Sequence, residues 1–142
     1  MNKVQHENSD ALVLLGIIYA SDNGKKQATL TQIIRACDFI EHVIITYDEL
    51  KGGLVRLVND NNIVEMQKLL FIPSDTVSQK FFEYSKSKKR SNAREDLGFI
   101  KKLVNAKEWD RNVNLVEISK NYNFSGLDYD IYDSSCKEYL GK

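Results

Sequence analysis

The chain has 142 residues, of which 42% are hydrophobic, and its formal net charge at pH 7 is zero. This length and composition predict one compact domain with room for a C-terminal addition. No apolar run reaches the roughly 18 residues that a membrane-spanning helix needs, and the polar N-terminal residues lack the apolar core of a signal peptide, so we expect a cytoplasmic protein that does not enter a membrane.

Charge is distributed unevenly along the chain. Residues 1–84 contain eight Lys and Arg against eleven Asp and Glu, residues 85–111 contain nine against four, and residues 112–142 contain three against five. The local net charges are therefore −3, +5 and −2. Phosphate neutralisation supplies much of the affinity for DNA, and a DNA-reading domain would concentrate Lys and Arg on its recognition helix and wing, whereas here that part is mildly acidic and the basic charge follows it.

The first part of the chain predicts two helices separated by a short strand. Apolar residues recur at helical spacing from Asp10 to Ala20, after an N-cap at Ser9 or Asp10. A turn around Gly24 leads to residues 28–30, which we expect to be extended and to join a sheet. Thr31 is the expected N-cap of the second helix. The apolar residues expected to point inward from that helix are Ile33, Ile34, Cys37, Phe39 and Ile40.

A third helix is expected to begin at Thr46, because Glu49 stands three positions later and completes a capping box. Gly52 and Gly53 lie inside this helix at a cost of about 1 kcal/mol each relative to alanine. Such a pair indicates close approach of a neighbouring helix or of a ligand backbone, and we favour the helix. The residues expected on the buried face are Leu50, Leu54, Leu57 and Val58.

A hairpin is expected after the third helix, which should end at residues 60–62. Residues 63–66 and 69–72 are predicted to be strands around a tight turn at Gln67 and Lys68. The order of helix, short strand, two helices and hairpin is that of a winged helix-turn-helix core. We assign this domain to residues 1–84.

Residues 10–73 resemble a group of small uncharacterised bacterial winged-helix proteins. The resemblance covers under half of the chain, implies the fold, and carries over no activity, ligand or catalytic residue. The segments that carry it are Ala36-Cys37-Asp38, His42-Val43-Ile44, Thr46-Tyr47-Asp48-Glu49-Leu50 and Gly53-Leu54-Val55-Arg56-Leu57.

The remaining residues, 85–142, are predicted to form a basic connector, a helix and a C-terminal extension of helical or mixed structure. Before them, Ser74 or Asp75 caps a fourth helix, whose inward residues should be Val77, Phe81, Phe82 and Tyr84. A further helix is expected from Ala93 to Trp109, packed on its own core or across a homodimer axis, and we favour the dimer. The fold class is therefore α+β, mainly α.

Residue patterns typical of catalysis are almost absent, so we expect a protein that is not an enzyme and needs no metal or cofactor. The only histidines are His6 and His42, which cannot build a metal cluster or a catalytic triad. The two cysteines, Cys37 and Cys136, form no Cys-x-x-Cys motif, and we expect Cys37 to be a core residue.

Two functional hypotheses follow. In the first, which we favour on the analogy of fold, the protein is a DNA-binding transcriptional regulator whose third helix enters the major groove of double-stranded DNA. Tyr47, Lys51 and Val55 would point outward to the bases. Seven basic residues would contact phosphates: Lys25, Lys26, Lys68, Lys86, Lys88, Lys89 and Arg90.

In the second hypothesis the winged helix is a non-catalytic scaffold for protein–protein interaction or dimerisation. The acidic third helix, with Asp48, Glu49 and Asp60, and the short hairpin favour it. The C-terminal aromatics Tyr122, Phe124, Tyr129 and Tyr132 would then be available for a partner.

Overall fold

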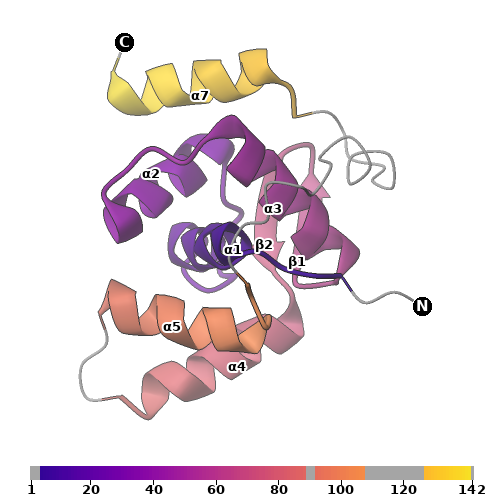
Figure 1. Ribbon diagram of the computed structural model, residues 1–142, viewed down its shortest axis with the longest axis vertical. Helices are drawn as coiled ribbons and strands as arrows, with labels where there is room; N and C mark the ends of the chain where they lie inside the picture. Colours follow the sequence, from indigo (N-terminus) through magenta and orange to yellow (C-terminus); the bar gives the residue numbers. More distant parts are fainter. Residues whose placement is uncertain (1–3, 89–91, 108–126, 142) are drawn as a thin grey trace.

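The computed structural model describes residues 4–88, 92–107 and 127–141, and in these residues the protein is α+β and mainly helical. The central helix α1 lies between two groups of elements, with α2 and α3 on one side and α4 and α5 on the other (Figure 1). The helices are α1 (Asn8–Ala20), α2 (Leu30–Glu41), α3 (Tyr47–Asn59), α4 (Asp75–Lys86), α5 (Ala93–Leu103) and α7 (Tyr129–Leu140), and the strands are β1 (Ile63–Gln67) and β2 (Leu70–Pro73).

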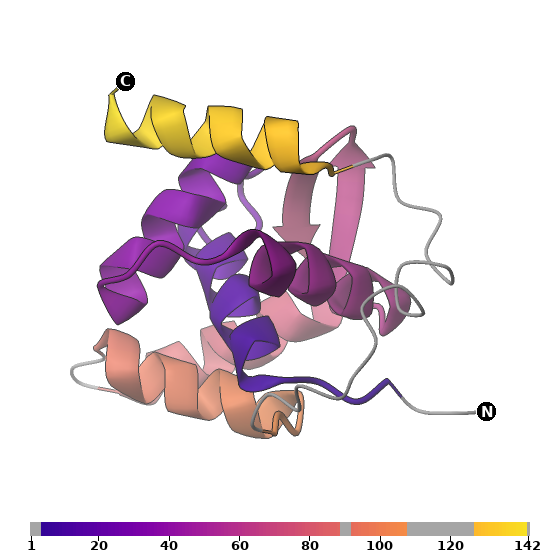
Figure 2. The ribbon, with the colours of Figure 1, turned by 45° about the horizontal axis from the view of Figure 1, so that its top comes forward.

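Helix α1 forms the centre of the hydrophobic core. It is apolar on every side, and every residue from Ala11 to Ile18 is buried. A helix of this composition needs partners all around it, and α1 contacts α2, α3 and α5 (Figure 2). The expected position of this helix is confirmed, although it begins two residues earlier than Asp10, with Glu7 as its N-cap.

Capping boxes fix the first residues of α2 and α3. The Thr46 side chain accepts from the backbone of Glu49, as expected, and the Glu49 side chain accepts from the backbone of Thr46. The expected cap of α2 at Thr31 is wrong, because Thr29 takes that role with Gln32. Both threonines are suitable caps, but only Thr29 has a glutamine three positions later to complete the box.

The sheet is the antiparallel hairpin β1–β2, in which Val64 lies opposite Ile72 and Glu65 opposite Phe71. The predicted strands are confirmed, with the turn one residue later than expected. The expected strand at 28–30 is reduced to a single antiparallel bridge between Ala28 and Phe71, with backbone N–O distances of 2.8 and 3.0 Å. It is short because Leu30 already belongs to α2.

The two glycines of α3 mark close approaches within the chain. A Cβ at Gly53 would lie 2.9 Å from Cγ2 of Val13, so this glycine lets α1 and α3 pack closely. A Cβ at Gly52 would lie 2.9 Å from the Arg56 guanidinium, which folds back across the helix surface. The helix-packing interpretation therefore accounts for Gly53, whereas Gly52 makes room for a side chain of its own helix.

Two aromatic residues expected in the core are exposed. Phe39 is 66% exposed and Phe82 is 54% exposed. Successive residues of a helix are rotated by about 100°, so Phe82 turns away from the face that buries Val77 and Phe81. Phe39 is two positions beyond the buried Cys37 and therefore points to nearly the opposite side of α2.

Helix α5 packs on the core of its own chain. Leu97 and Ile100 are buried and α5 contacts α1, so the apolar face that suggested a dimer seam is used inside the molecule. The helix ends at Leu103, earlier than expected, and Trp109 lies outside the described residues.

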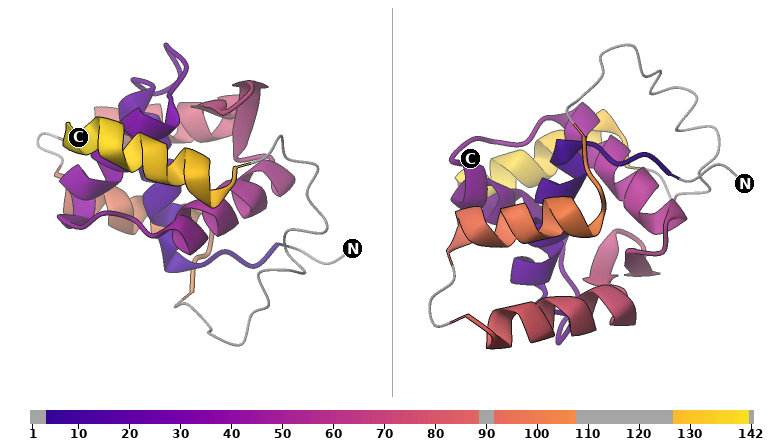
Figure 3. Two further views of the ribbon diagram at one scale, coloured as in Figure 1. Left: turned by 90° about the horizontal axis from the view of Figure 1, so that it is seen from above. Right: turned by 60° about the horizontal axis from the view of Figure 1, so that its bottom comes forward.

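The C-terminal extension, expected to be helical or mixed, contains helix α7. Its N-cap is Asp128, whose side chain accepts from the backbone N–H of Ile131, and Gly141 ends it in the left-handed conformation with φ of 76°. The helix lies along the outside of α2 and buries Tyr132 and Cys136 (Figure 3). Throughout the described ranges, no helix is both long and apolar enough to cross a membrane.

Candidate functional site

The start of α3, expected to face DNA, is covered by the C-terminal part of the chain. The Tyr47 hydroxyl donates to the backbone carbonyl of Leu127 at 3.3 Å. The Tyr47 ring centroid lies 5.7 Å from the centroids of both Tyr129 and Tyr132. The Tyr132 hydroxyl donates to the carbonyl of Ile45 at 2.5 Å, which fixes α7 just before α3 begins. Tyr47 therefore serves as a packing residue in this conformation.

The other two expected base-reading residues are not free either. The Lys51 ammonium donates to the Tyr47 hydroxyl at 3.2 Å and lies 5.6 Å from the centre of its ring. Val55 is 1% exposed, so the expectation that it points outward is wrong. The physical reason is that α3 is buried on more than one side, since burial is continuous from Gly52 to Leu57.

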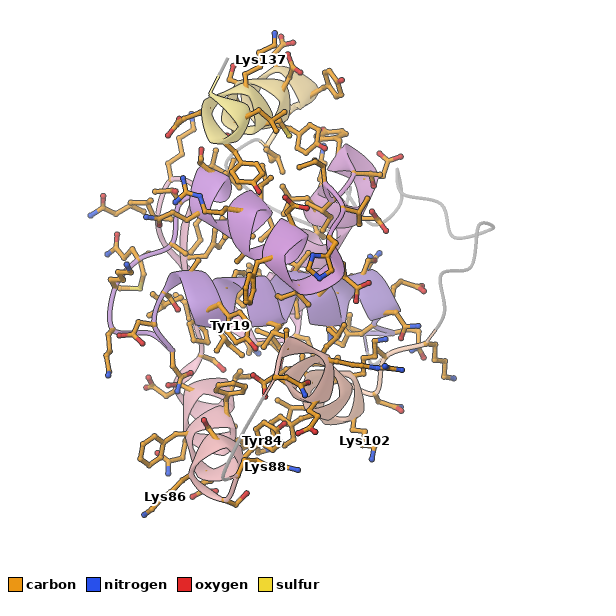
Figure 4. All side chains as sticks on the ribbon, turned by 90° about the vertical axis from the view of Figure 1, so that its left-hand side faces the viewer. Tyr19, Tyr84, Lys86, Lys88, Lys102 and Lys137 are labelled. Atoms are coloured by element: carbon orange, nitrogen blue, oxygen red, sulfur yellow. The ribbon has the colours of Figure 1, made fainter. Side chains whose placement is uncertain are left out.

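The basic residues expected to bind phosphate lie apart from α3. Lys25 and Lys26 are exposed in the turn after α1, Lys68 is exposed at the hairpin turn, and Lys86 and Lys88 are exposed at the end of α4. Figure 4 shows Lys86 and Lys88 at the opposite end of the molecule from Lys137 of α7, whereas Tyr47 packs against α7. Lys89 and Arg90 lie outside the described residues. Lys86 and Lys88 are therefore not on the same surface as Tyr47.

A buried polar network joins the N-terminal segment to α1 and to both ends of the turn after α3. Arg56 donates to Asp10 through Nε and Nη2, each at 2.7 Å, in a bidentate pair. His6 lies between two carboxylates, with Nδ1 2.9 Å from Asp10 and Nε2 2.7 Å from Asp60. Asn62 donates to Asp60 at 3.2 Å. The contact between His6 and Asp60 joins residues that are 54 positions apart in the sequence.

The network is buried at His6, Asp10 and Arg56 and reaches the surface at Asp60, whose side chain is 39% exposed, and its charges balance when His6 is protonated. The exposed fractions are 1% for His6, 0% for Asp10 and 5% for Arg56. Burial disfavours the imidazolium, but hydrogen bonds and charge interactions with Asp10 and Asp60 outweigh burial and raise the pKa of His6 above 6.5. Two cations then face two carboxylates, which is the condition under which buried charges are tolerated.

The network stabilises the packing of the N-terminal segment, α1 and α3, and its hydrogen bonds leave no atom of Asp10 or His6 for catalysis. Both oxygens of Asp10 already accept hydrogen bonds, and both ring nitrogens of His6 face carboxylates. A catalytic base or nucleophile needs an atom that can reach a substrate, and Asp10 and His6 have no such atom. Sequence reasoning missed this site. A detectable signal was present, because Asp10 is an acidic residue at the start of an apolar helix and His6 stands four positions before it.

A second buried carboxylate, that of Asp96 on α5, links α5 to α1 and α4. Asp96 is 3% exposed and accepts from the Tyr19 hydroxyl at 2.5 Å and from the Tyr84 hydroxyl at 3.1 Å. Tyr19 lies on α1 and Tyr84 lies on α4 (Figure 4), and both donate to this carboxylate of α5. Burial and the bond to Asp96 raise the pKa of Tyr84 to about 12, so Tyr84 remains a donor at neutral pH.

We expect the free energy of unfolding to decrease as pH rises above 6.5, through the raised pKa of His6. The folded protein holds the His6 proton more tightly than the unfolded chain, so this stabilisation is fully present below 6.5 and is lost once folded His6 deprotonates. Urea unfolding at a series of pH values measures the slope. His6→Gln should flatten it, and an unchanged slope in this variant would assign the pH dependence to other groups.

Comparisons with known proteins give no assignment for these features. No protein-family model, curated protein or solved structure matches the chain significantly. Within the part of the chain that the structure describes, no group of three or more His, Cys, Asp and Glu residues is arranged to hold a metal ion. The function therefore has to be argued from the surfaces themselves.

Proposed function

We propose that the protein is a non-catalytic interaction module of winged-helix topology that forms a homodimer through its β1–β2 hairpin. The observation that carries this proposal is an uncharged apolar face on the outside of the hairpin. Val64 is 43% exposed and Met66 is 48% exposed, so two large apolar side chains of one strand lie in contact with solvent.

The register extends this face to the second strand at Val64, whereas Met66 lies in the irregularity between Glu65 and Gln67. Val64 lies directly opposite Ile72, and side chains of directly opposed residues share one face of an antiparallel pair. Ile63 and Phe71 are buried, so the core-facing side of the hairpin is the other one. Residues 63–73 contain one lysine and one glutamate, so the hairpin has no excess of the cations that phosphate contact requires.

A second copy of the chain is the partner that this face fits best. Two identical uncharged surfaces meet without like-charge repulsion, and a two-fold axis pairs each apolar side chain with its counterpart. The zero net charge of the whole chain also favours self-association. Moreover, α5 buries its apolar face against the core of its own chain, so the hairpin is the better candidate for a dimer surface.

The winged-helix topology is supported by the element order. Three helices precede a hairpin, and the extended residue Ala28, between α1 and α2, bridges to Phe71 in β2. Winged helices serve protein contact as well as nucleic-acid contact, so the topology is compatible with this proposal and does not by itself require DNA.

We expect the molar mass measured by light scattering to rise with concentration between about 1 and about 500 µM, the range in which small interfaces associate. Met66→Glu places a charge in the apolar face and should keep the protein monomeric. Phe82→Glu is the matched control, because Phe82 is a similarly exposed apolar residue on α4. A wild type that stays monomeric, or equal loss of the dimer in both variants, would contradict the hairpin interface.

DNA binding is the second candidate, and the exposed cations at the end of α4 favour it. Lys86 and Lys88 protrude from a part of the molecule that α7 does not cover (Figure 4). Together with Lys89 and Arg90 they belong to the most basic stretch of the sequence. This mode would use the backbone of the duplex, because the base-reading positions of α3 are covered.

For this candidate we expect weak binding of duplex DNA that does not depend on base sequence. Four phosphate contacts give a log–log salt slope of about −3.6. Changing Lys86, Lys88, Lys89 and Arg90 to alanine should abolish binding for all sequences tested. Selective loss in Lys51→Ala would instead indicate reading by α3, and absence of wild-type binding at low salt would eliminate the candidate.

A further inference from the structure

The exposed Phe39 ring forms one wall of a groove between the end of α1 and α2. The ring centroids of Phe39 and Tyr19 are 6.3 Å apart in an edge-to-face arrangement, so the two rings form a continuous apolar surface. The groove has a volume of about 430 Å³, within the range of small-molecule sites. Its lining residues are Tyr19, Ala20, Lys26, Gln32, Arg35, Ala36 and Phe39.

The lining combines apolar groups with positive charge. Lys26 and Arg35 are both cationic and exposed, and the lining contains no carboxylate. Asp96 accepts from the Tyr19 hydroxyl and Asp38 accepts from the Tyr139 hydroxyl, and neither carboxylate is among the residues that line the groove. The Arg35 guanidinium lies 5.8 Å from the centre of the Tyr139 ring, a contact that leaves its charge intact.

We propose that this groove binds a small amphipathic carboxylate, such as a medium-chain fatty acid. The alkyl chain would lie against Phe39, Tyr19 and Ala36, where it removes apolar surface from water. The carboxylate would lie between Arg35 and Lys26, since a guanidinium and an ammonium both donate charge-assisted hydrogen bonds to carboxylate oxygens. This site is separate from the hairpin surface, so it stands independently of the dimer proposal.

Three eight-carbon ligands that differ only in their head group test the role of charge. Octanoate, octanol and octylamine are each titrated into the full chain, with amide NMR shifts as the readout. Octanoate should give saturable shifts at the end of α1 and along α2, whereas octanol and octylamine should bind at least about tenfold more weakly, since a charged hydrogen bond changes affinity by that factor or more. Equal binding of octanoate and octanol would overturn the proposal.

Matched variants locate the site. Arg35→Gln should weaken octanoate binding about tenfold, while Lys102→Gln, a change of an exposed lysine on α5, should leave it unchanged. Phe39→Ala should weaken binding by removing a wall of the groove, while Phe82→Ala, a change at a similarly exposed phenylalanine on α4, should not. All four side chains are largely exposed, so the fold should be retained. Binding that survives both groove variants, or no saturable binding to the wild type, would overturn the proposal.

Discussion

Asp10→Ala is expected to lower the free energy of unfolding by about 3 to 5 kcal/mol, the usual cost of breaking a buried ion pair from one side. Asp10 is fully buried and takes three of the network's hydrogen bonds, two from Arg56 and one from His6. Removing it leaves a guanidinium and an imidazolium in the interior without their shared carboxylate. Urea denaturation followed by circular dichroism at pH 6 to 7 measures the loss.

Asp133→Ala is the control for this result. Asp133 also pairs with a cation, Lys137 at 2.9 Å, but the pair lies on the surface of α7, with the side chains 40% and 62% exposed. Such a surface pair contributes little to stability. If the two aspartate variants lost similar stability, or if Asp10→Ala lost less than about 1 kcal/mol, the buried network would not stabilise the fold as proposed.

Leu54→Ala is expected to lower the free energy of unfolding by about 2 to 5 kcal/mol. Leu54 has no exposed surface and belongs to the core formed by α1, α2 and α3, so the truncation leaves a cavity as well as removing apolar contacts. The same substitution at Leu140, which is 52% exposed on α7, should change stability by about 0.5 kcal/mol or less. A near-neutral result at Leu54 would mean that α3 relaxes into the space.

The elements that could be predicted from sequence are those specified by neighbouring residues. Thr46 and Glu49 are three positions apart, and their reciprocal hydrogen bonds need nothing from the rest of the chain. The hairpin likewise follows from two apolar stretches around a polar turn. Where two local solutions competed, as at Thr29 and Thr31, sequence reasoning chose the wrong one, although the Gln32 partner was visible.

The features that could not be predicted depend on residues that are distant in sequence. Asp10 and Arg56 are 46 positions apart, and neither residue indicates the other until α1 and α3 are packed. The packing of the C-terminal extension on Tyr47 was not foreseen, because these contacts join residues 80 or more positions apart. The candidate DNA site was therefore wrong at Val55 and covered at Tyr47, since a helix's outward face cannot be assigned before its neighbours are known.

The central position of α1 also has a consequence for biosynthesis. Helix α5, which covers one side of α1, is synthesised about 80 residues after α1, and at about 5 to 20 residues per second that delay lasts several seconds. The backbone bond from Asn8 to Lys107 cannot close until that later segment has emerged. During this interval α2 and α3 can already pack on α1, but the side of α1 that α5 covers stays an exposed apolar surface. Fragments that end before α5 would leave this side of α1 uncovered and are expected to aggregate.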